Sequence, residues 1–92
     1  MSATIRERLI VALLARGENF EPARTTSRYI AMSRSDTTIN AYIYIGKAGA
    51  CRVGATASDS YSFDKLRDTL LSEADALPPA QFKDLKKKVP KL

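Results

Sequence analysis

The stretch YIYIGKAGACRVG, residues 42–54, decides the fold because its pattern predicts two β-strands joined by a tight turn. YIYI and ACRV are short runs rich in β-branched and aromatic residues, and glycines lie between them. We predict a three-residue loop from Lys47 to Gly49, with Gly49 in the left-handed conformation of a G1 bulge. The hairpin register that follows pairs Ile45 with Cys51, Tyr44 with Arg52 and Ile43 with Val53.

A further strand is predicted in RYIAMSR, residues 28–34, ahead of this hairpin. A four-residue loop at 35–38 would pair Ile30 with Ile43. Both turns then agree about which side chains share a face. The agreement is informative because a slip of one residue in either pairing would exchange the two faces. The apolar face consists of Ile30, Met32, Ala41, Ile43, Ile45, Cys51 and Val53. The opposite face carries Tyr29, Ala31, Ser33, Tyr42, Tyr44 and Arg52.

Helices are predicted on both sides of these strands. Residues 4–16 carry apolar side chains at helical spacing, and Gly17 follows where a helix would end. Residues 63–77 repeat apolar residues every three or four positions, with Ser62 at the expected N-cap. Pro78 and Pro79 end that helix and can begin a further short one. The apolar stripe of the first helix consists of Ile5, Leu9, Ala12 and Leu13, widened by Ile10 and Leu14.

The order of these elements predicts an α+β fold. An N-terminal helix, a three-stranded antiparallel meander and one or two C-terminal helices form a two-layer sandwich, with helices 4–16 and 63–77 covering the apolar sheet face. Residues 17–27, GENFEPARTTS, are expected to form a loop because of Pro22 and the Thr/Ser cluster. With 92 residues, we expect a single α+β domain over 1–80 and a basic C-terminal helix or tail over 81–92.

The composition argues against several function classes. The chain has no histidine and one cysteine, Cys51, so zinc clusters and Ser–His or Cys–His catalysis have no residues to build them. The glycines at 46, 49 and 54 do not form a phosphate loop, because a strand rather than a helix follows them. We therefore expect a non-enzymatic protein with no catalytic residue, metal or cofactor. The chain contains neither a membrane-spanning apolar run nor a recognisable secretory signal, which favours a cytoplasmic location.

The net charge of +5 is concentrated at the C-terminus. Residues 81–92 contribute +4, so residues 1–80 contribute only +1. A lysine cluster of this kind attracts phosphate backbones without reading their sequence, and it is equally consistent with a solubilising end. The cluster consists of Lys83, Lys86, Lys87, Lys88 and Lys91, against Asp84.

Two resemblances are visible in the motifs. YIYIGKAG, with Tyr29 fifteen positions before Tyr44, resembles the YIG half of the GIY-YIG endonucleases. That resemblance implies a metal-assisted nuclease whose arginine and glutamate would be Arg52 and Glu73, although the glycine before the first tyrosine is missing. The helix, the RYxxxxR strand and the GKAGACRVG hairpin together resemble small uncharacterised proteins of bacteriophages and other mobile elements. This second resemblance implies a phage-encoded protein in the host cytoplasm and assigns no residue roles.

Two functions from different classes fit the sequence. The first is a nucleic-acid-binding module that contacts DNA or RNA through the Tyr/Arg sheet face, while the lysine-rich tail adds salt-dependent affinity. The alternative is an interaction or assembly protein that forms a homodimer or docks a protein partner through the same face. No membrane partner is expected. The candidate binding residues are Tyr29, Tyr42, Tyr44, Arg52, Lys47, Lys83, Lys86, Lys87 and Lys88.

Overall fold

A computed structural model describes residues 3–17, 19–26, 28–34 and 41–91. These residues form an α+β fold, as the sequence predicts, with three helices on a five-stranded sheet. The sheet has the strand order β1-β2-β3-β4-β5, and every neighbouring pair is antiparallel. The elements are α1 (Ile5–Ala15), β1 (Phe20–Thr25), β2 (Tyr29–Arg34), β3 (Tyr42–Gly46), β4 (Cys51–Gly54), β5 (Tyr61–Ser62), α2 (Asp64–Ala76) and α3 (Pro79–Lys86).

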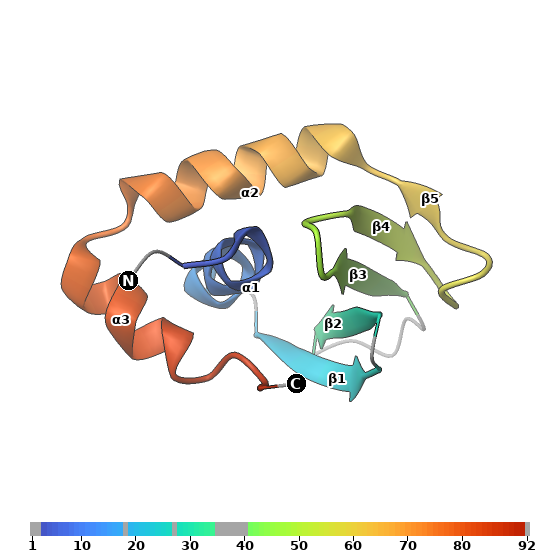
Figure 1. Ribbon diagram of the computed structural model, residues 1–92, viewed down its shortest axis with the longest axis horizontal. Coiled ribbons are helices and arrows are strands. Elements are labelled where there is room, and N and C mark those ends of the chain that lie inside the picture. Colours follow the sequence, from blue (N-terminus) through green and yellow to red (C-terminus); the bar gives the residue numbers. More distant parts are fainter. Residues whose placement is uncertain (1–2, 18, 27, 35–40, 92) are drawn as a thin grey trace.

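All three helices lie on one side of the sheet, and α1 is the central one (Figure 1). The sheet covers one side of α1, while α2 and α3 pack against its other sides. Ion pairs join α1 to α2, with Arg8 Nη2 2.7 Å from Asp75 and Arg16 Nη2 2.8 Å from Glu73. Among the strands, α2 contacts chiefly β4. Of the two helices expected to cover the apolar sheet face, α1 contacts β1 and β3, whereas α2 packs mainly on α1.

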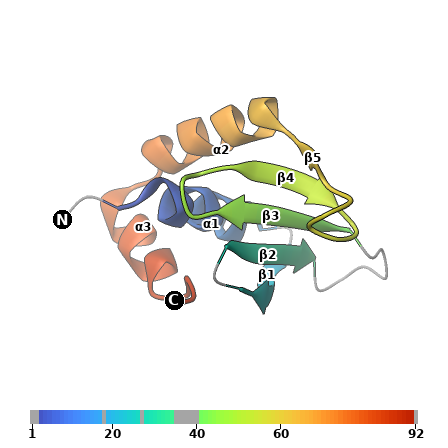
Figure 2. The same cartoon turned by 45° about the vertical axis from the view of Figure 1, so that its right-hand side comes forward.

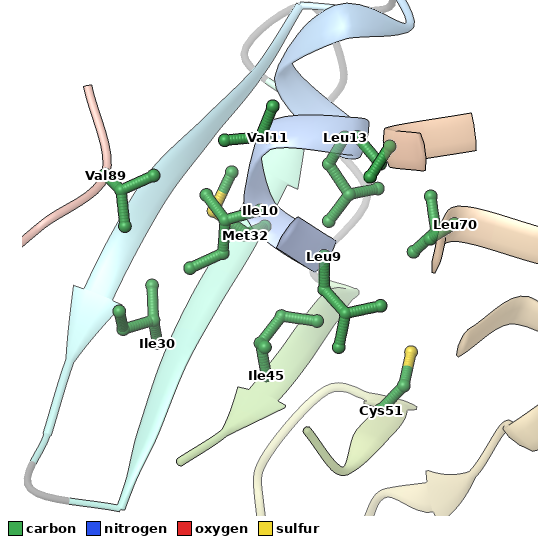
Figure 3. Packing of buried hydrophobic residues seen from close by; sticks show 12 residues of the cluster. Leu9, Ile10, Val11, Leu13, Ile30, Met32, Ile45, Cys51, Leu70 and Val89 are labelled. Atoms are coloured by element: carbon green, nitrogen blue, oxygen red, sulfur yellow. The ribbon is translucent and has the colours of Figure 1, made fainter. Parts of the chain in front are cut away.

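Core side chains pack on several sides of α1 and not only along one stripe of it. Five consecutive residues, from Leu9 to Leu13, are at most 1% exposed. Val11 lies outside the predicted stripe yet is 0% exposed, whereas Ile5, within the stripe, is 44% exposed. Figure 3 shows the reason, since side chains from the sheet, from α2 and from the segment after α3 all reach this helix. A helix that is packed on several sides has no polar stripe along its middle.

The hairpin between β3 and β4 has the predicted register and turn. β3 and β4 lie side by side in the sheet (Figure 2). Ile45 lies opposite Cys51, and Ile43 lies opposite Val53. The Gly49 N–H donates to the Gly46 carbonyl at 3.0 Å, and Gly49 has a φ of 93°. The left-handed bulge glycine inferred from the sequence is thus confirmed.

The predicted pairing of β2 with β3 is wrong by two residues. Ile30 lies opposite Ile45 rather than Ile43, and Met32 lies opposite Ile43. The observed pairing requires a connection two residues longer than the predicted four-residue loop at 35–38. That loop lies outside the described residues. A shift of two residues keeps each side chain on its face. The predicted division into an apolar face and a tyrosine face therefore survives the error in register.

Two strands were not predicted. Residues 20–25, expected to be part of a loop, form β1 at one edge of the sheet. Proline is tolerated at an edge or a bulge, and the register of β1 shifts between Pro22 and Arg24. At the other edge, β5 has only two residues, which is too short to give a sequence pattern. The meander consequently has five strands instead of three.

The C-terminal part also differs in detail from expectation. Phe63, not Ser62, is the N-cap of α2, and it makes no side-chain capping bond. A short helix does follow the two prolines, with α3 beginning at Pro79, and Val89 beyond it is only 9% exposed within the core cluster. The basic segment is therefore packed against the body of the protein. No helix in the described ranges is long and apolar enough to cross a membrane.

Candidate nucleic-acid interface

The tyrosines predicted to share a sheet face do lie together on the side away from α1. The rings of Tyr29 and Tyr44 are 6.1 Å apart in an edge-to-face arrangement, and those of Tyr42 and Tyr44 are 5.9 Å apart. Tyr44 is only 4% exposed, and its hydroxyl donates to the Ala55 carbonyl at 3.1 Å. Its ring is thus covered by protein, while Tyr29 and Tyr42 remain half-buried. On this face, bases could therefore stack only on the rings of Tyr29 and Tyr42.

Arg52 lies on the same face and uses all three guanidinium nitrogens within the chain. Its Nε donates to Ser60 Oγ at 2.8 Å, its Nη1 donates to Ser62 Oγ at 3.1 Å, and its Nη2 donates to the Ser60 carbonyl. These bonds hold the loop 55–60 against the sheet. The loop approaches so closely that a Cβ at Gly54 would be 2.6 Å from Ser60 Cα. Arg52 therefore fixes a loop, and a ligand would have to compete for its hydrogen bonds.

One further cation on this face, Arg24, is not among the predicted binding residues, because residues 17–27 are expected from the sequence to be a loop. The Arg24 guanidinium lies 5.3 Å from the centre of the Tyr42 ring, in cation–π geometry. A cavity of about 130 Å³ lies beside it, lined by Arg24, Thr26, Tyr29, Ala31, Tyr44, Thr56 and Ala57. A cavity of this size is below the range of about 300–1,000 Å³ that is usual for small-molecule sites.

A larger hollow lies between the first turn of α1 and the C-terminal segment. Its volume is about 630 Å³, within the range of ligand sites of about 300–1,000 Å³. Five cations and one carboxylate line it, so its charge is strongly positive. We call it the basic hollow, and its lining residues are Thr4, Arg6, Glu7, Lys83, Lys86, Lys87, Val89, Pro90 and Lys91.

The first turn of α1 gives the basic hollow its fixed wall. Thr4 and Glu7 form a capping box, in which the Thr4 N–H donates to Glu7 Oε1 at 2.9 Å and the Glu7 N–H donates to Thr4 Oγ1 at 3.1 Å. The hydrogen bond from the Thr4 N–H is the main cause that lowers the pKa of Glu7 below its ordinary value. Glu7 is accordingly ionised at neutral pH, and its Oε2 lies 3.7 Å from Lys86 Nζ.

The predicted lysines occupy different positions relative to this hollow. Lys83, Lys86 and Lys87 line it, whereas Lys88 is exposed beyond α3 and is not part of its wall. Lys47 is exposed at the tip of the β3–β4 hairpin. That tip packs on α1, because a Cβ at Gly49 would overlap with Ile5 Cγ2. The first turn of α1 therefore has the hairpin tip on one side and the basic hollow on another.

Arg6 and Lys91 were not among the predicted binding residues. Arg6 is separated by more than 75 positions from the lysines that it joins, and its place depends on how α3 packs against α1. A periodic pattern of apolar residues cannot reveal a contact between residues so far apart in the sequence. Lys91 belongs to the predicted cluster of positive charge, and that charge count was the one signal that could have found it.

Cys51, Arg52 and Glu73 all lie in buried or hydrogen-bonded positions. No cluster of three or more His, Cys, Asp or Glu suitable for a metal ion occurs among the described residues. Cys51 is buried, and burial raises the pKa of its thiol to about 11, so the unreactive thiol form prevails at neutral pH. Glu73, suggested by the nuclease resemblance, accepts hydrogen bonds from Arg16 on α1, whereas Arg52 bonds to Ser60 and Ser62.

Fold and site together define a small α+β protein with a helix-centred core and a basic hollow. Comparison of the chain with protein-family models, with curated proteins and with solved structures finds no match. The functional argument consequently rests on the charges and contacts of the residues themselves.

Proposed function

We propose that this protein is a nucleic-acid-binding module whose contact surface is the basic hollow and the lysines around it. The observation that carries the proposal is the gathering of Arg6, from one end of the chain, with four lysines from the other end around a single concave surface. Phosphate backbones bind to surfaces of this kind largely through Lys and Arg, with an affinity that falls as salt rises.

The distribution of charge over the helices supports the same surface. The segment from α3 to residue 91 carries five lysines and one aspartate, while α2 carries four carboxylates and two cations. A polar arrangement of this sort orients an approaching polyanion toward the basic end. The tyrosine face contributes less to the proposal, because Tyr44 is buried and Arg52 is bonded to Ser60 and Ser62.

Replacing Lys83, Lys86 and Lys87 together with alanine is expected to flatten the salt dependence of binding. Each phosphate contact contributes a slope of about 0.9 in log K against log salt for duplex DNA and about 0.7 for a single strand. Loss of three contacts should therefore reduce the slope by about 2.7 or about 2.1. Fluorescence anisotropy with labelled oligonucleotides, titrated from about 20 to about 200 mM salt, measures this slope.

The matched control removes the same charge elsewhere. Arg24, Arg28 and Lys65 are exposed and do not line the basic hollow, so their joint replacement with alanine should leave most of the slope intact. Equal slopes for the two triple variants would contradict the proposed surface. Absence of any binding by the unchanged protein at low salt, to both single-stranded and duplex DNA and RNA, would contradict the proposed function itself.

A further inference from the structure

The basic hollow has hydrogen-bond donors in excess of acceptors. Its side-chain acceptors are the Thr4 hydroxyl and the Glu7 carboxylate, and both take part in the capping box. Glu7 also forms an ion pair with Lys86, with 3.7 Å between Oε2 and Nζ. The remaining lining groups with charge are ammonium and guanidinium groups, which donate and cannot accept. Lys87 Nζ lies 3.9 Å from Asp84 Oδ1, beyond the lining of the hollow. The five lining cations still outnumber the carboxylates beside them, so a bound anion would supply the missing acceptors.

Arg6 is the residue at which this shortage of hydrogen-bond acceptors can be located. Its Nη1 atom is buried and has no hydrogen-bond partner among the described residues. A buried donor without a partner costs free energy, because it has lost its hydrogen bonds to water without replacement. Arginine binds phosphate with paired N–H donors, so a rotation of the guanidinium group that brings Nη1 to the hollow would let a bound phosphate supply the acceptor that it lacks. The hollow thus combines a positive field with one donor that is incomplete in the free protein.

We propose that the basic hollow is a phosphate-binding site in which Arg6 binds the phosphate oxygens directly. This inference rests on the proposed function to the extent that a phosphate of the bound strand is the ligand. It adds a positioned contact to what would otherwise be a diffuse attraction. The excess of four positive charges over the single carboxylate suits a dianionic terminal phosphate or two consecutive phosphates better than one isolated phosphodiester.

Inorganic pyrophosphate and short oligonucleotides with and without a 5′-phosphate test the proposal on the full chain. Binding is followed by two-dimensional ¹H–¹⁵N NMR, with the backbone signals of Thr4, Arg6 and Val89 as reporters. We expect pyrophosphate to shift these three signals. Arg6→Gln should weaken binding of pyrophosphate by at least about tenfold, because a hydrogen bond to a charged group is lost. Arg28→Gln, which removes the same charge from an exposed site, should change the affinity less than about twofold.

Arg6→Lys separates geometry from charge. It keeps the positive charge and loses the paired donors, so it should also weaken pyrophosphate binding several-fold, and its fold is checked from the dispersion of the same spectra. Tighter binding of the 5′-phosphorylated oligonucleotide would identify the end of a strand as the source of the phosphate, and equal binding of the two oligonucleotides would identify an internal phosphate. Both results support the site if Arg6→Gln weakens them.

The inference and the proposed function fail in different ways. If oligonucleotides bind and Arg6→Gln has no more effect than Arg28→Gln, the phosphate site is wrong and the binding function stands. If pyrophosphate binds through Arg6 and no oligonucleotide binds, the phosphate site stands and the nucleic-acid function is wrong. Absence of any shift with pyrophosphate, at millimolar concentration and low salt, would overturn the phosphate site.

Discussion

Replacement of Val11 with aspartate is expected to unfold the protein at room temperature. Val11 is 0% exposed at the centre of α1, among side chains from the sheet and from the segment after α3. A carboxylate there would be buried without a partner, at a cost of several kcal/mol against a total stability of about 5–15 kcal/mol for a typical domain. Far-ultraviolet circular dichroism and a urea titration of the purified variant measure the outcome.

Ile5→Asp is the control for this substitution, because it introduces the same side chain into the same helix. Ile5 is 44% exposed, and a carboxylate in a first helical turn interacts favourably with the helix dipole. We expect a loss of no more than about 1 kcal/mol. The amphipathic stripe inferred from the sequence gives the opposite ranking, with Ile5 in the core and Val11 outside it. A folded Val11→Asp variant beside an unfolded Ile5→Asp variant would contradict the central position of α1.

Gly49→Ala is expected to lower the free energy of unfolding by about 2–3 kcal/mol. Two causes add at this position. The φ of Gly49 is 93°, which strains any residue with a Cβ, and the added methyl group would overlap with Ile5 Cγ2. Urea titration gives the free energy, and an unchanged m value would show that the denatured state is not the cause.

Two further variants separate the causes. Gly17 also has a positive φ, of 69°, but a Cβ there would have no neighbour within 4 Å, so Gly17→Ala should cost about 1 kcal/mol. Ile5→Ala in the Gly49→Ala background should recover about 1 kcal/mol, because the overlap disappears. Equal costs for Gly17→Ala and Gly49→Ala, with no coupling to Ile5, would show that the hairpin tip does not pack on α1.

The parts of the fold that could be predicted are those fixed by neighbours in the sequence. The turn at 47–49 has three residues and ends on a glycine that can adopt the left-handed conformation. Its length and type determine the register of β3 with β4, which therefore follows from the sequence alone. The pairing of β2 with β3 depends on a longer connection whose length had to be assumed, and the assumption was two residues too short. Because the error is an even number of residues, each side chain still lies on the sheet face that was predicted for it.

Other parts depend on contacts that no local pattern contains. Pro22 and the Thr/Ser cluster favour a loop, yet an edge strand with a bulge accommodates them. Val11 is buried in a cluster whose other members come from distant parts of the chain, and the pattern of α1 alone cannot show that they cover it. In the candidate site, the cluster of lysines is visible in the sequence, whereas its meeting with Arg6 follows only from the packing of α3 on α1.

Mapping of a bound oligonucleotide on the protein by ¹H–¹⁵N NMR tests the central claim most directly. The basic hollow, as the nucleic-acid interface, predicts that the signals of residues 4–7 and 83–91 shift first and farthest at low salt, and that added salt reverses the shifts. Signals of the sheet face that carries Tyr29 and Tyr42 should change little. Large shifts on that sheet face, with residues 4–7 and 83–91 unmoved, would contradict the account.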